Sequence, residues 1–380
     1  MPSPDDQPDI DPTREAVIDD DPNTSARDSA GARPAAALSS RRTTLSTVAT
    51  AAGVSIATVS KVINGRSGVG DDTRRRVESA ITDLGYVSLG ERQGSVNAAQ
   101  EMTVELIVDP RDVPNPYLST LLGGAMAAAV DLRCGLVLRS IAAIQAQRPT
   151  TWAQDLGRAG RAGVIEVTNS YSALREKALS RAGLPMVLVD PIDVPRTSTP
   201  SIGATNWAGA YAATQHLIEL GHRHIRYIGG PPGARCDVVR AHGWSAAMTE
   251  AGLVADLAHV PRHSFTYEHG LDAGLQLLGG PDRPTAIFAG SDASATGVLE
   301  AARRLGLSVP SDVSVVGFDD TLLAQTSAPA MTAVHQPIAE IGRAAVSTLV
   351  RLARGDVLTT KRVELATHLV IRDSTAPPRG

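Results

Sequence analysis

A chain of 380 residues is long enough for two or three domains, each burying its own hydrophobic core. Lys and Arg number 36 against 40 Asp and Glu, and the resulting formal net charge of −4 on its face argues against a nucleic-acid partner. Cys134 and Cys236 lack the spacing of zinc ligands, and no segment approaches the ~18 apolar residues that a membrane span needs. Because the N-terminus also lacks the basic and apolar regions of a secretory signal, we expect a cytoplasmic protein with no structural metal, no cofactor and no membrane partner.

The charges are unevenly distributed along the chain. Residues 1–40 carry nine Asp or Glu against three Arg, a composition too polar to bury a core, so we expect a disordered acidic arm there. Residues 41–90 instead carry a cluster of basic side chains: Arg41, Arg42, Lys61, Arg66, Arg74, Arg75 and Arg76. Such a basic module is the electrostatic pattern of a phosphate-binding surface.

Three short helices are predicted between residues 43 and 85. Hydroxyl residues suited to an N-cap precede the first, Gly53 supplies a tight turn, and Ser55 can cap the second. Apolar residues recur at helical spacing in each helix: Leu45, Val48, Ala49 and Ala52, then Val59, Val62 and Ile63, then Val77, Ile81 and Leu84. This is a helix-turn-helix pattern, with a third helix to complete a small core.

The second of these helices has an outward face of mostly short side chains: Ile56, Ala57, Thr58, Ser60 and Lys61. Short side chains let a helix approach the wall of a DNA groove, and Lys61 is long enough to reach a guanine edge or a phosphate. The alternative is that any helical hairpin rich in Ala, Ser and Thr would show the same pattern.

The run TLSTVATAAGVSIATVSKVINGRSGVGDDTRRRVESAITDLGYV resembles the DNA-binding headpiece of the lactose-repressor (LacI/GalR) family. The resemblance implies a DNA-binding domain over residues 41–88. It implies that Ile56, Ala57 and Lys61 read bases in a major groove, as recognition-helix residues do. Polar residues at the family's backbone-contacting positions would orient the module without reading sequence: Thr44, Ser55, Thr58, Ser60, Asn64 and Thr73.

The chain departs from the family pattern after the headpiece. Where the family carries a hinge helix with a leucine that enters the minor groove, residues 87–100 read VSLGERQGSVNAAQ, with Ser95 at the leucine position. Each glycine costs a helix about 1 kcal/mol relative to Ala. We therefore expect residues 89–101 to be a linker without the hinge helix and without the DNA kink it produces.

From Met102 onward, short apolar runs alternate with amphipathic stretches, which predicts an α/β fold with parallel sheets flanked by helices. The predicted strands are Val104–Val108, Gly135–Ser140, Gly163–Val167, Met186–Val189, Ile225–Gly229, Ala286–Ala289 and Val313–Gly317. The predicted helices include Leu118–Arg133, Asn206–Leu220, Arg240–Ala251, Tyr267–Leu278 and Ala293–Leu305. These are too many strands for one small sheet.

Two motifs in this region could indicate an enzyme. Gly229-Gly-Pro-Pro-Gly follows a strand, but it lacks the lysine of a phosphate loop and the register of a dinucleotide-binding turn. Asp319 and Asp320 end a strand, but neighbouring residues of an extended chain point to opposite sides, so both carboxylates would not serve one reaction. We favour one carboxylate that binds a polar ligand at the carboxyl end of a strand, and the alternative is a plain turn residue.

Several stretches of the body are similar to the effector domain of the same family, among them GATNWAGAYAATQHLIELGHRHIRYIGGP and PTAIFAGSDASATGVLEAARRLGLSVPSDVSVVGFDD. The resemblance implies a two-lobed domain over residues 102–375, like periplasmic sugar-binding proteins, with a ligand between the lobes. Met102 to about Ile202 and about Val334 to Leu358 would form the lobe nearer the DNA. The family's effector positions fall on Tyr117, Asp190, Arg240, Phe265, Ser291 and Asp319, with Asp292 and Gln336 close by.

The chemistry of these positions suits a polyol. Carboxylates accept hydroxyl protons, Arg240 donates a planar fork, and Phe265 offers an apolar surface to a sugar ring. Structural alternatives stay open: Asp292 would cap the helix Ala293–Leu305, Arg240 would pair with a carboxylate between the lobes, and Tyr117 and Phe265 would be core residues.

We therefore interpret the chain as a sequence-specific repressor of carbohydrate-utilisation genes. The resemblance implies a homodimer on palindromic double-stranded operator DNA, controlled by a mono- or disaccharide. The resemblance implies a sugar that releases the DNA, and the alternative is a sugar that acts as a co-repressor. A cytoplasmic sugar sensor without DNA function would leave the basic headpiece unexplained, and an enzyme is disfavoured because no nucleophile, metal cluster or cofactor loop converges.

Overall fold

The computed structural model describes residues 44–63, 68–84, 102–193 and 199–379. The acidic arm of residues 1–40 and the linker 89–101 lie outside the described residues. The predictions of disorder in the arm and of a missing hinge helix in the linker therefore stay predictions. The chain divides into two compact units, Met1–Asn97 and Ala98–Gly380.

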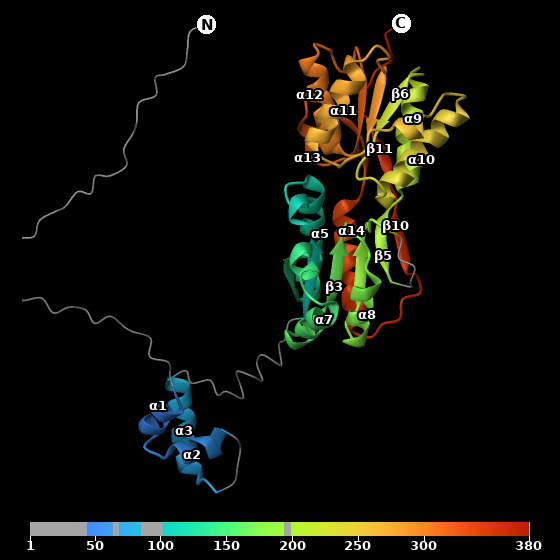
Figure 1. Ribbon diagram of the computed structural model, residues 1–380. Coiled ribbons are helices and arrows are strands. Elements are labelled where there is room, and N and C mark those ends of the chain that lie inside the picture. Colours follow the sequence, from blue (N-terminus) through green and yellow to red (C-terminus); the bar gives the residue numbers. More distant parts are fainter. Residues whose placement is uncertain (1–43, 64–67, 85–101, 194–198, 380) are drawn as a thin grey trace, which may run out of the picture. The chain divides into compact units, whose positions relative to one another are not determined.

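Residues 44–84 of the first unit, as far as they are described, form three helices: α1 Leu45–Ala52, α2 Ile56–Ile63 and α3 Asp71–Asp83 (Figure 1). The predicted caps are confirmed: Thr44 and Thr47 form a capping box, Gly53 ends α1 at φ 66°, and Ser55 Oγ accepts the Thr58 N–H at 3.2 Å. All three helices contribute to one small core of Val48, Ala49, Ala52, Val59, Val62, Val77 and Ala80. The predicted three-helix module is therefore confirmed.

Within the described residues, no single helix is long and apolar enough to span a membrane. By length and composition alone, α1 and α2 taken together would be long and apolar enough to span one, but the pair is bent by 102° at the break between the two helices.

The second unit begins with a lobe built on a parallel sheet, whose described strands run in the order β10-β5-β4-β3-β1-β2 (Figure 1). The strands are β1 Met102–Val108, β2 Cys134–Ser140, β3 Arg161–Val167, β4 Met186–Val189, β5 Ser201–Ala204 and β10 Arg362–Leu365. One face is covered by α5 Pro116–Leu132 and α14 Ile338–Ala353. The other is covered by α6 Ile141–Gln145, α7 Pro149–Arg158 and α8 Ala173–Arg181.

The second lobe has a sheet whose described strands run β11-β9-β8-β7-β6, with only the edge strand β11 antiparallel to its neighbour. They are β6 Ile225–Ile228, β7 Ala286–Ala289, β8 Ser314–Asp319, β9 Thr332–His335 and β11 His368–Val370. One face packs on α9 Asn206–Glu219 and α10 Arg235–Glu250, the other on α11 Tyr267–Gly279, α12 Asp292–Arg304 and α13 Leu322–Thr326. Short 3-10 turns at Pro110–Asp112 and Leu257–His259 complete the described elements.

Within the described residues, the chain passes between the lobes three times: at Thr205, at Gln336–Pro337 and at Ala366–Thr367. The predicted boundaries of the first lobe were wrong by a few residues at two of these passages. Val334 lies in β9 and in the core of the second lobe, and the first lobe extends past residue 358 to include β10. Each lobe thus receives an edge strand from the C-terminal part of the chain.

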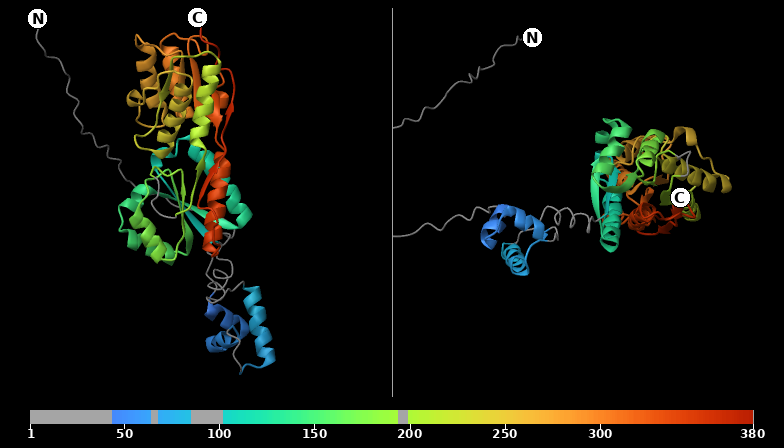
Figure 2. Two further views of the ribbon diagram at one scale, coloured as in Figure 1. Left: turned by 90° about the vertical axis from the view of Figure 1, so that its right-hand side faces the viewer. Right: turned by 90° about the horizontal axis from the view of Figure 1, so that it is seen from below.

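The helices α5 and α14 lie side by side on the first lobe, and glycines let their backbones touch (Figures 1 and 2). A Cβ on Gly124 would lie 1.8 Å from the carbonyl oxygen of Ala339, and one on Gly342 would lie 2.1 Å from that of Leu121. Both neighbours are backbone atoms of a packed helix, so neither can turn away. We infer that small residues at 124 and 342 set the spacing of this helix pair.

We expect Gly124→Ala to lower the free energy of unfolding of the two-lobed unit by about 1–3 kcal/mol, because the added methyl forces the two helices apart. Gly123 is the matched control, since it lies in the same helix with nothing within 4 Å of a new Cβ. Gly123→Ala should stabilise the unit by up to about 1 kcal/mol through helix propensity. Urea unfolding followed by circular dichroism measures both, and equal effects would rule out the close approach as the cause.

Candidate functional site

The exposed face of α2 carries the residues predicted to read DNA bases. Ile56 is 51% exposed, and Ala57 and Lys61 are exposed beside it. Val59 and Val62 of the same helix are buried in the core. The buried side of the helix therefore packs in the core, and its opposite side presents an apolar and cationic face to solvent.

The other residues predicted to contact DNA surround α1, α2 and α3. Thr44 and Ser55 are exposed, and Thr58, Ser60 and Thr73 are half-buried, while Asn64 lies outside the described residues. The hydroxyls of Ser55 and Thr58 are 2.9 Å apart and hold the start of α2. Exposed hydroxyls at a helix start are suited to phosphate contact because the free N–H groups there favour an anion.

In the two-lobed unit, predicted ligand residues come from both lobes and meet at the carboxyl ends of the parallel strands. Asp190 directly follows β4 of the first lobe, and Asp319 is the last residue of β8 in the second. Both adopt the left-handed backbone region, with φ of 41° and 116°. Burial raises the pKa of the Asp190 carboxyl, and the neighbouring Arg240 opposes that rise. Charged groups of the two lobes therefore face one another.

Arg240 of α10 is the buried cation of this group, with 4% of its surface exposed. Its Nε donates to Asn206 Oδ1 at 2.7 Å and its Nη1 to the carbonyl oxygen of Gly290 at 2.5 Å. The guanidinium carbon lies 3.8 Å from the ring centre of Phe318 and 5.3 Å from that of Phe265. Arg240 is therefore held by an amide and a backbone carbonyl. Within the described part of the chain, it is not held by a hydrogen bond to a carboxylate between the lobes, which was the alternative.

The carboxylates are held by specific donors. The hydroxyl of Tyr117 on α5 donates to Asp190 Oδ2, and Gln336 Nε2 donates to Asp319 Oδ1 at 2.6 Å. Burial raises the pKa of Asp319 to about 6, while Arg240 and the Gln336 bond oppose that rise. Tyr117 also packs against the core of the first lobe, so it has a structural role as well.

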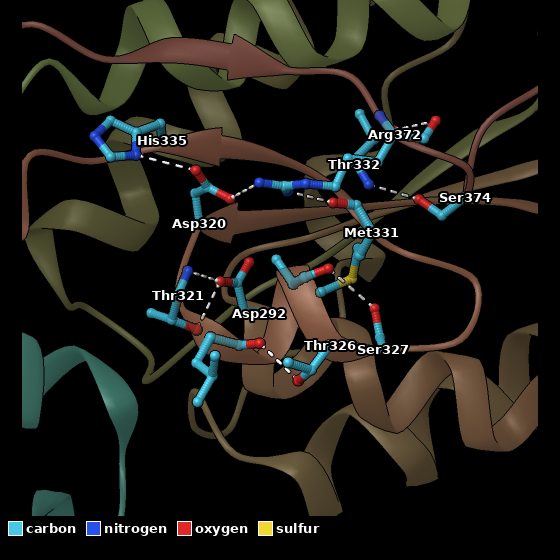
Figure 3. Close-up of polar contacts among 12 residues, drawn as sticks. Asp292, Asp320, Thr321, Thr326, Ser327, Met331, Thr332, His335, Arg372 and Ser374 are labelled. Carbon is cyan, nitrogen blue, oxygen red and sulfur yellow. Dashed lines mark hydrogen bonds and ion pairs between the residues drawn. The ribbon is translucent and has the colours of Figure 1, made fainter.

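Ser291 and Asp292 stand at the start of α12. Ser291 is the N-cap, because its Oγ accepts the N–H of Ser294 at 3.1 Å. The alternative that Asp292 caps this helix was therefore wrong, since the helix begins one residue earlier than expected. Asp292 Oδ2 instead accepts the N–H and the hydroxyl of Thr321, at 2.6 and 2.9 Å (Figure 3). Burial, with the nearby Asp319, raises the pKa of Asp292 well above its usual value.

The neighbouring carboxylates Asp319 and Asp320 have separate partners, as predicted. Asp320 Oδ1 accepts from Arg372 Nη2 at 2.6 Å, and Asp320 Oδ2 lies 3.1 Å from His335 Nδ1 (Figure 3). These contacts tie the end of β8 to β9 and to the C-terminal segment. Asp320 is thus structural, and Asp319 alone faces the charged group.

The glycines after β6 accommodate side chains of the protein itself. A Cβ on Gly230 would lie 2.3 Å from the ring of Phe265, and one on Gly229 would lie 2.8 Å from Asp237 Oδ1. The Gly230 N–H also donates to Asp237 Oδ1 at 2.8 Å. The absence of a side chain at Gly230 therefore makes room for the ring of Phe265 close to Arg240. These glycines accommodate side chains of the protein and do not form a phosphate loop.

A cleft of about 80 Å³ opens beside Asp190 and is lined by residues of both lobes, including Asn206, Cys236 and Glu364. Asp190 is the one predicted ligand residue among its lining residues. Asn206 and Phe318, which hold Arg240, were not predicted as site residues. No group of three or more His, Cys, Asp or Glu side chains among the described residues is arranged to hold a metal ion.

Comparison with known proteins matches both units. Residues 44–88 match the model of the bacterial regulatory proteins of the lacI family, and residues 214–375 match that of the periplasmic binding protein-like domain. The chain is 33% identical over 351 residues to the HTH-type transcriptional regulator DegA of Bacillus subtilis (strain 168), covering 88% of this chain and 99% of the relative. It is 34% identical over 339 residues to the HTH-type transcriptional regulator CelR of Thermobifida fusca, covering 88% and 98%.

Two solved structures are similar over the same span. The CelR–cellobiose complex has a TM-score of 0.65 at 33% identity, and the lac repressor dimer bound to operator and the anti-inducer ONPF has a TM-score of 0.67 at 26% identity. Each covers 88% of this chain, and the whole of the solved chain is matched. The similarity therefore includes the headpiece and both lobes.

Proposed function

Because this chain belongs to the lacI family of bacterial regulatory proteins, which are DNA-binding transcriptional regulators, we propose a function of the same kind. The protein is a cytoplasmic repressor of carbohydrate-utilisation genes, and a small sugar controls its binding to DNA. The family consists of transcriptional regulators, not enzymes. The helix-turn-helix of residues 44–84 contacts the operator through the exposed face of α2, with Ile56, Ala57 and Lys61 at the bases. The sugar lies between the two lobes.

The observation that carries the sugar proposal is the meeting of Asp190, Arg240 and Asp319 from opposite lobes at the carboxyl ends of their sheets. Carboxylates accept pairs of hydroxyl protons, and a guanidinium donates to ring and hydroxyl oxygens. Phe265, seated against Gly230, adds an apolar surface for C–H groups. A relative, CelR, has been solved in complex with cellobiose, which supports the same class of ligand here.

The cleft beside Asp190 is not a complete sugar site, because its volume of about 80 Å³ is smaller than the roughly 300–1,000 Å³ of ordinary ligand sites and Arg240 and Asp319 do not line it. We infer that a sugar enters when the lobes move apart and is enclosed when they close. A sugar shifts operator affinity only through its difference in affinity for the two arrangements, and operator DNA must then shift sugar affinity by the same factor.

The operator-bound form is a homodimer, which places two recognition helices in successive major grooves of a palindromic site. The structure of the lac repressor dimer on its operator supports this assembly for a chain of the same family.

The experiment that tests the proposal measures fluorescence anisotropy of labelled DNA from the region upstream of the gene, at two salt concentrations and with a panel of sugars that includes cellobiose and D-ribose. Salt-dependent binding released by one sugar establishes an inducible repressor. Binding that one sugar strengthens instead establishes a co-repressor-dependent regulator. Sugar binding by calorimetry with no DNA binding in any condition would leave only the alternative of a sugar sensor.

Sugar affinity should fall at low pH because Asp319 titrates close to pH 6. Hydroxyl donors bond best to the ionised carboxylate, so the bound sugar lowers the pKa of Asp319 and binding releases a proton. Affinity is then constant well above pH 6 and falls below it, by up to about tenfold per pH unit for one proton. Burial also raises the pKa of Asp190, which acts in the same direction.

Calorimetry between pH 5 and pH 8 measures this dependence. Asp319→Asn is the control, because its amide resembles the protonated carboxyl at every pH. Its affinity should be low throughout and should lose the fall near pH 6, leaving only the dependence that Asp190 contributes. A wild-type profile that is flat from pH 5 to pH 8 would contradict the role of Asp319.

A further inference from the structure

The charged groups of the site are fastened to the segments that pass between the lobes. Asn206 directly follows the passage at Thr205, and its Oδ1 accepts from Arg240 Nε at 2.7 Å. Gln336 lies in the second passage, and its Nε2 donates to Asp319 Oδ1 at 2.6 Å. Each amide thus joins one passage to one charged side chain that faces the site.

Both amides are buried and bound on further sides. Asn206 is 9% exposed, and its Nδ2 donates to the carbonyl oxygen of Ala204 at 3.0 Å, which ties it back to β5 of the first lobe. Gln336 is 1% exposed, and its backbone N–H donates to the carbonyl oxygen of Asp319 at 3.2 Å. Movement of Arg240 or Asp319 by about 1 Å therefore breaks these bonds or displaces the passages.

The third passage is joined to the first. The hydroxyls of Thr205 and Thr367 are 2.9 Å apart, and the Thr367 N–H donates to Thr205 Oγ1 at 2.9 Å. The Thr205 N–H donates in turn to the carbonyl oxygen of Leu365 at 2.9 Å. A displacement of Asn206 thus reaches two of the three described passages.

The two amides differ in one respect. Both polar atoms of Asn206 have partners, whereas Gln336 Oε1 is buried and has no hydrogen-bond partner among the described residues. An unpaired buried acceptor is costly, so a donor that reaches it gains more than it would at the surface. Gln336 can therefore accept a hydroxyl while it holds Asp319.

We propose that Asn206 and Gln336 are positioning residues that couple occupancy of the sugar site to the angle between the lobes. The inference rests on the proposed function. When a sugar engages Arg240 and Asp319, the two amides move with them, and the passages at Thr205 and Gln336–Pro337 change conformation. If these residues served only to shape the site, substituting them would weaken sugar binding, but saturating sugar would still change operator affinity as much as in the wild type.

The test separates affinity from coupling in the full-length dimer. Operator affinity is measured with no sugar and with a saturating concentration of whichever of cellobiose, D-ribose and the other panel sugars acts on the wild type, and saturation is checked by calorimetry. The ratio of the two operator affinities is the coupling factor, which for such proteins is about 5 to 150. Asn206→Leu and Gln336→Met remove the amides while keeping the length of the side chain, and Asn206→Asp keeps the acceptor for Arg240.

We expect the coupling factor at saturation to fall below about threefold in Asn206→Leu and Gln336→Met. Asn206→Asp should keep most of the coupling, and the operator affinity of each variant without sugar is the reference for its own coupling factor. Wild-type coupling in both amide-free variants at saturation overturns the proposal, as does an equal loss in Asn206→Asp and Asn206→Leu. If no sugar changes the operator affinity of the wild type, the proposed function itself is wrong. The wild type alone shows this, so this failure is distinguishable from failure of the coupling proposal.

Discussion

Asp319→Gly is expected to abolish the response to sugar while leaving operator binding without sugar within about twofold of wild type. Glycine is the appropriate replacement because residue 319 has φ of 116°, where alanine would strain the backbone. The variant removes a carboxylate that faces the site and the acceptor of the Gln336 bond. Hydrogen bonds to a charged group contribute about 1.5–3 kcal/mol each, so sugar affinity should fall by about tenfold to a hundredfold or more.

Calorimetric titration with the active sugar measures the loss, and thermal unfolding checks that the variant is folded. Asp282→Gly is the control, because it removes a carboxylate of the same lobe whose side chain is 76% exposed. That variant should bind sugar as the wild type does. Normal sugar affinity in Asp319→Gly would remove Asp319 from the site and leave Asp190 and Arg240 without their partner.

The strands that were predicted are those whose sequence is a continuous apolar run. Met186–Val189 and Ala286–Ala289 are buried at every residue, as central parallel strands are, and were predicted with correct ends. The edge strand β10 alternates between exposed and half-buried residues and was not predicted. It pairs with β5 from a distant part of the chain, and no local pattern encodes that pairing.

One missed element had a clear signal in the sequence. In α14, Ile338, Ile341, Ala345 and Leu349 recur at helical spacing and are buried in the core of the first lobe. The predicted starts of α9 and α11 are confirmed, whereas α10 begins at Arg235 rather than at the predicted Arg240. That difference places Arg240 within the helix, where its side chain is held against Phe318.

The prediction of the ligand site from sequence named its charged residues and also Tyr117 and Gln336, which hold the two carboxylates, but it did not name the residues that hold Arg240. Asp190 and Asp319 lie at the carboxyl ends of strands, which is a local signal for a ligand site in a parallel sheet. Asn206 and Phe318 act only because α10 brings Arg240 against them from a different part of the chain. Such partners depend on the packing of whole elements, and therefore the structure was needed to find them.

Lys61→Ala is expected to lower operator affinity strongly without changing sugar affinity. Lys61 is exposed on the face of α2 opposite the buried Val59 and Val62, so its side chain can be lost without disturbing the core. One lost base contact costs about 1–3 kcal/mol, or roughly 5- to 150-fold in affinity, and doubly so in a dimer with two equivalent helices.

Anisotropy titrations of the operator and of an unrelated duplex, each over a range of salt, distinguish the two contacts open to Lys61. If Lys61 bonds a guanine, the specific affinity should fall while the affinity for unrelated DNA changes little, because base contacts carry the specificity. If it bonds a phosphate, both affinities should fall and the salt slope should decrease by about 0.9 for each lysine removed. Lys177→Ala removes the same charge from the exposed face of α8 and should change neither. Unchanged operator affinity in Lys61→Ala would mean that α2 does not enter the groove by this face.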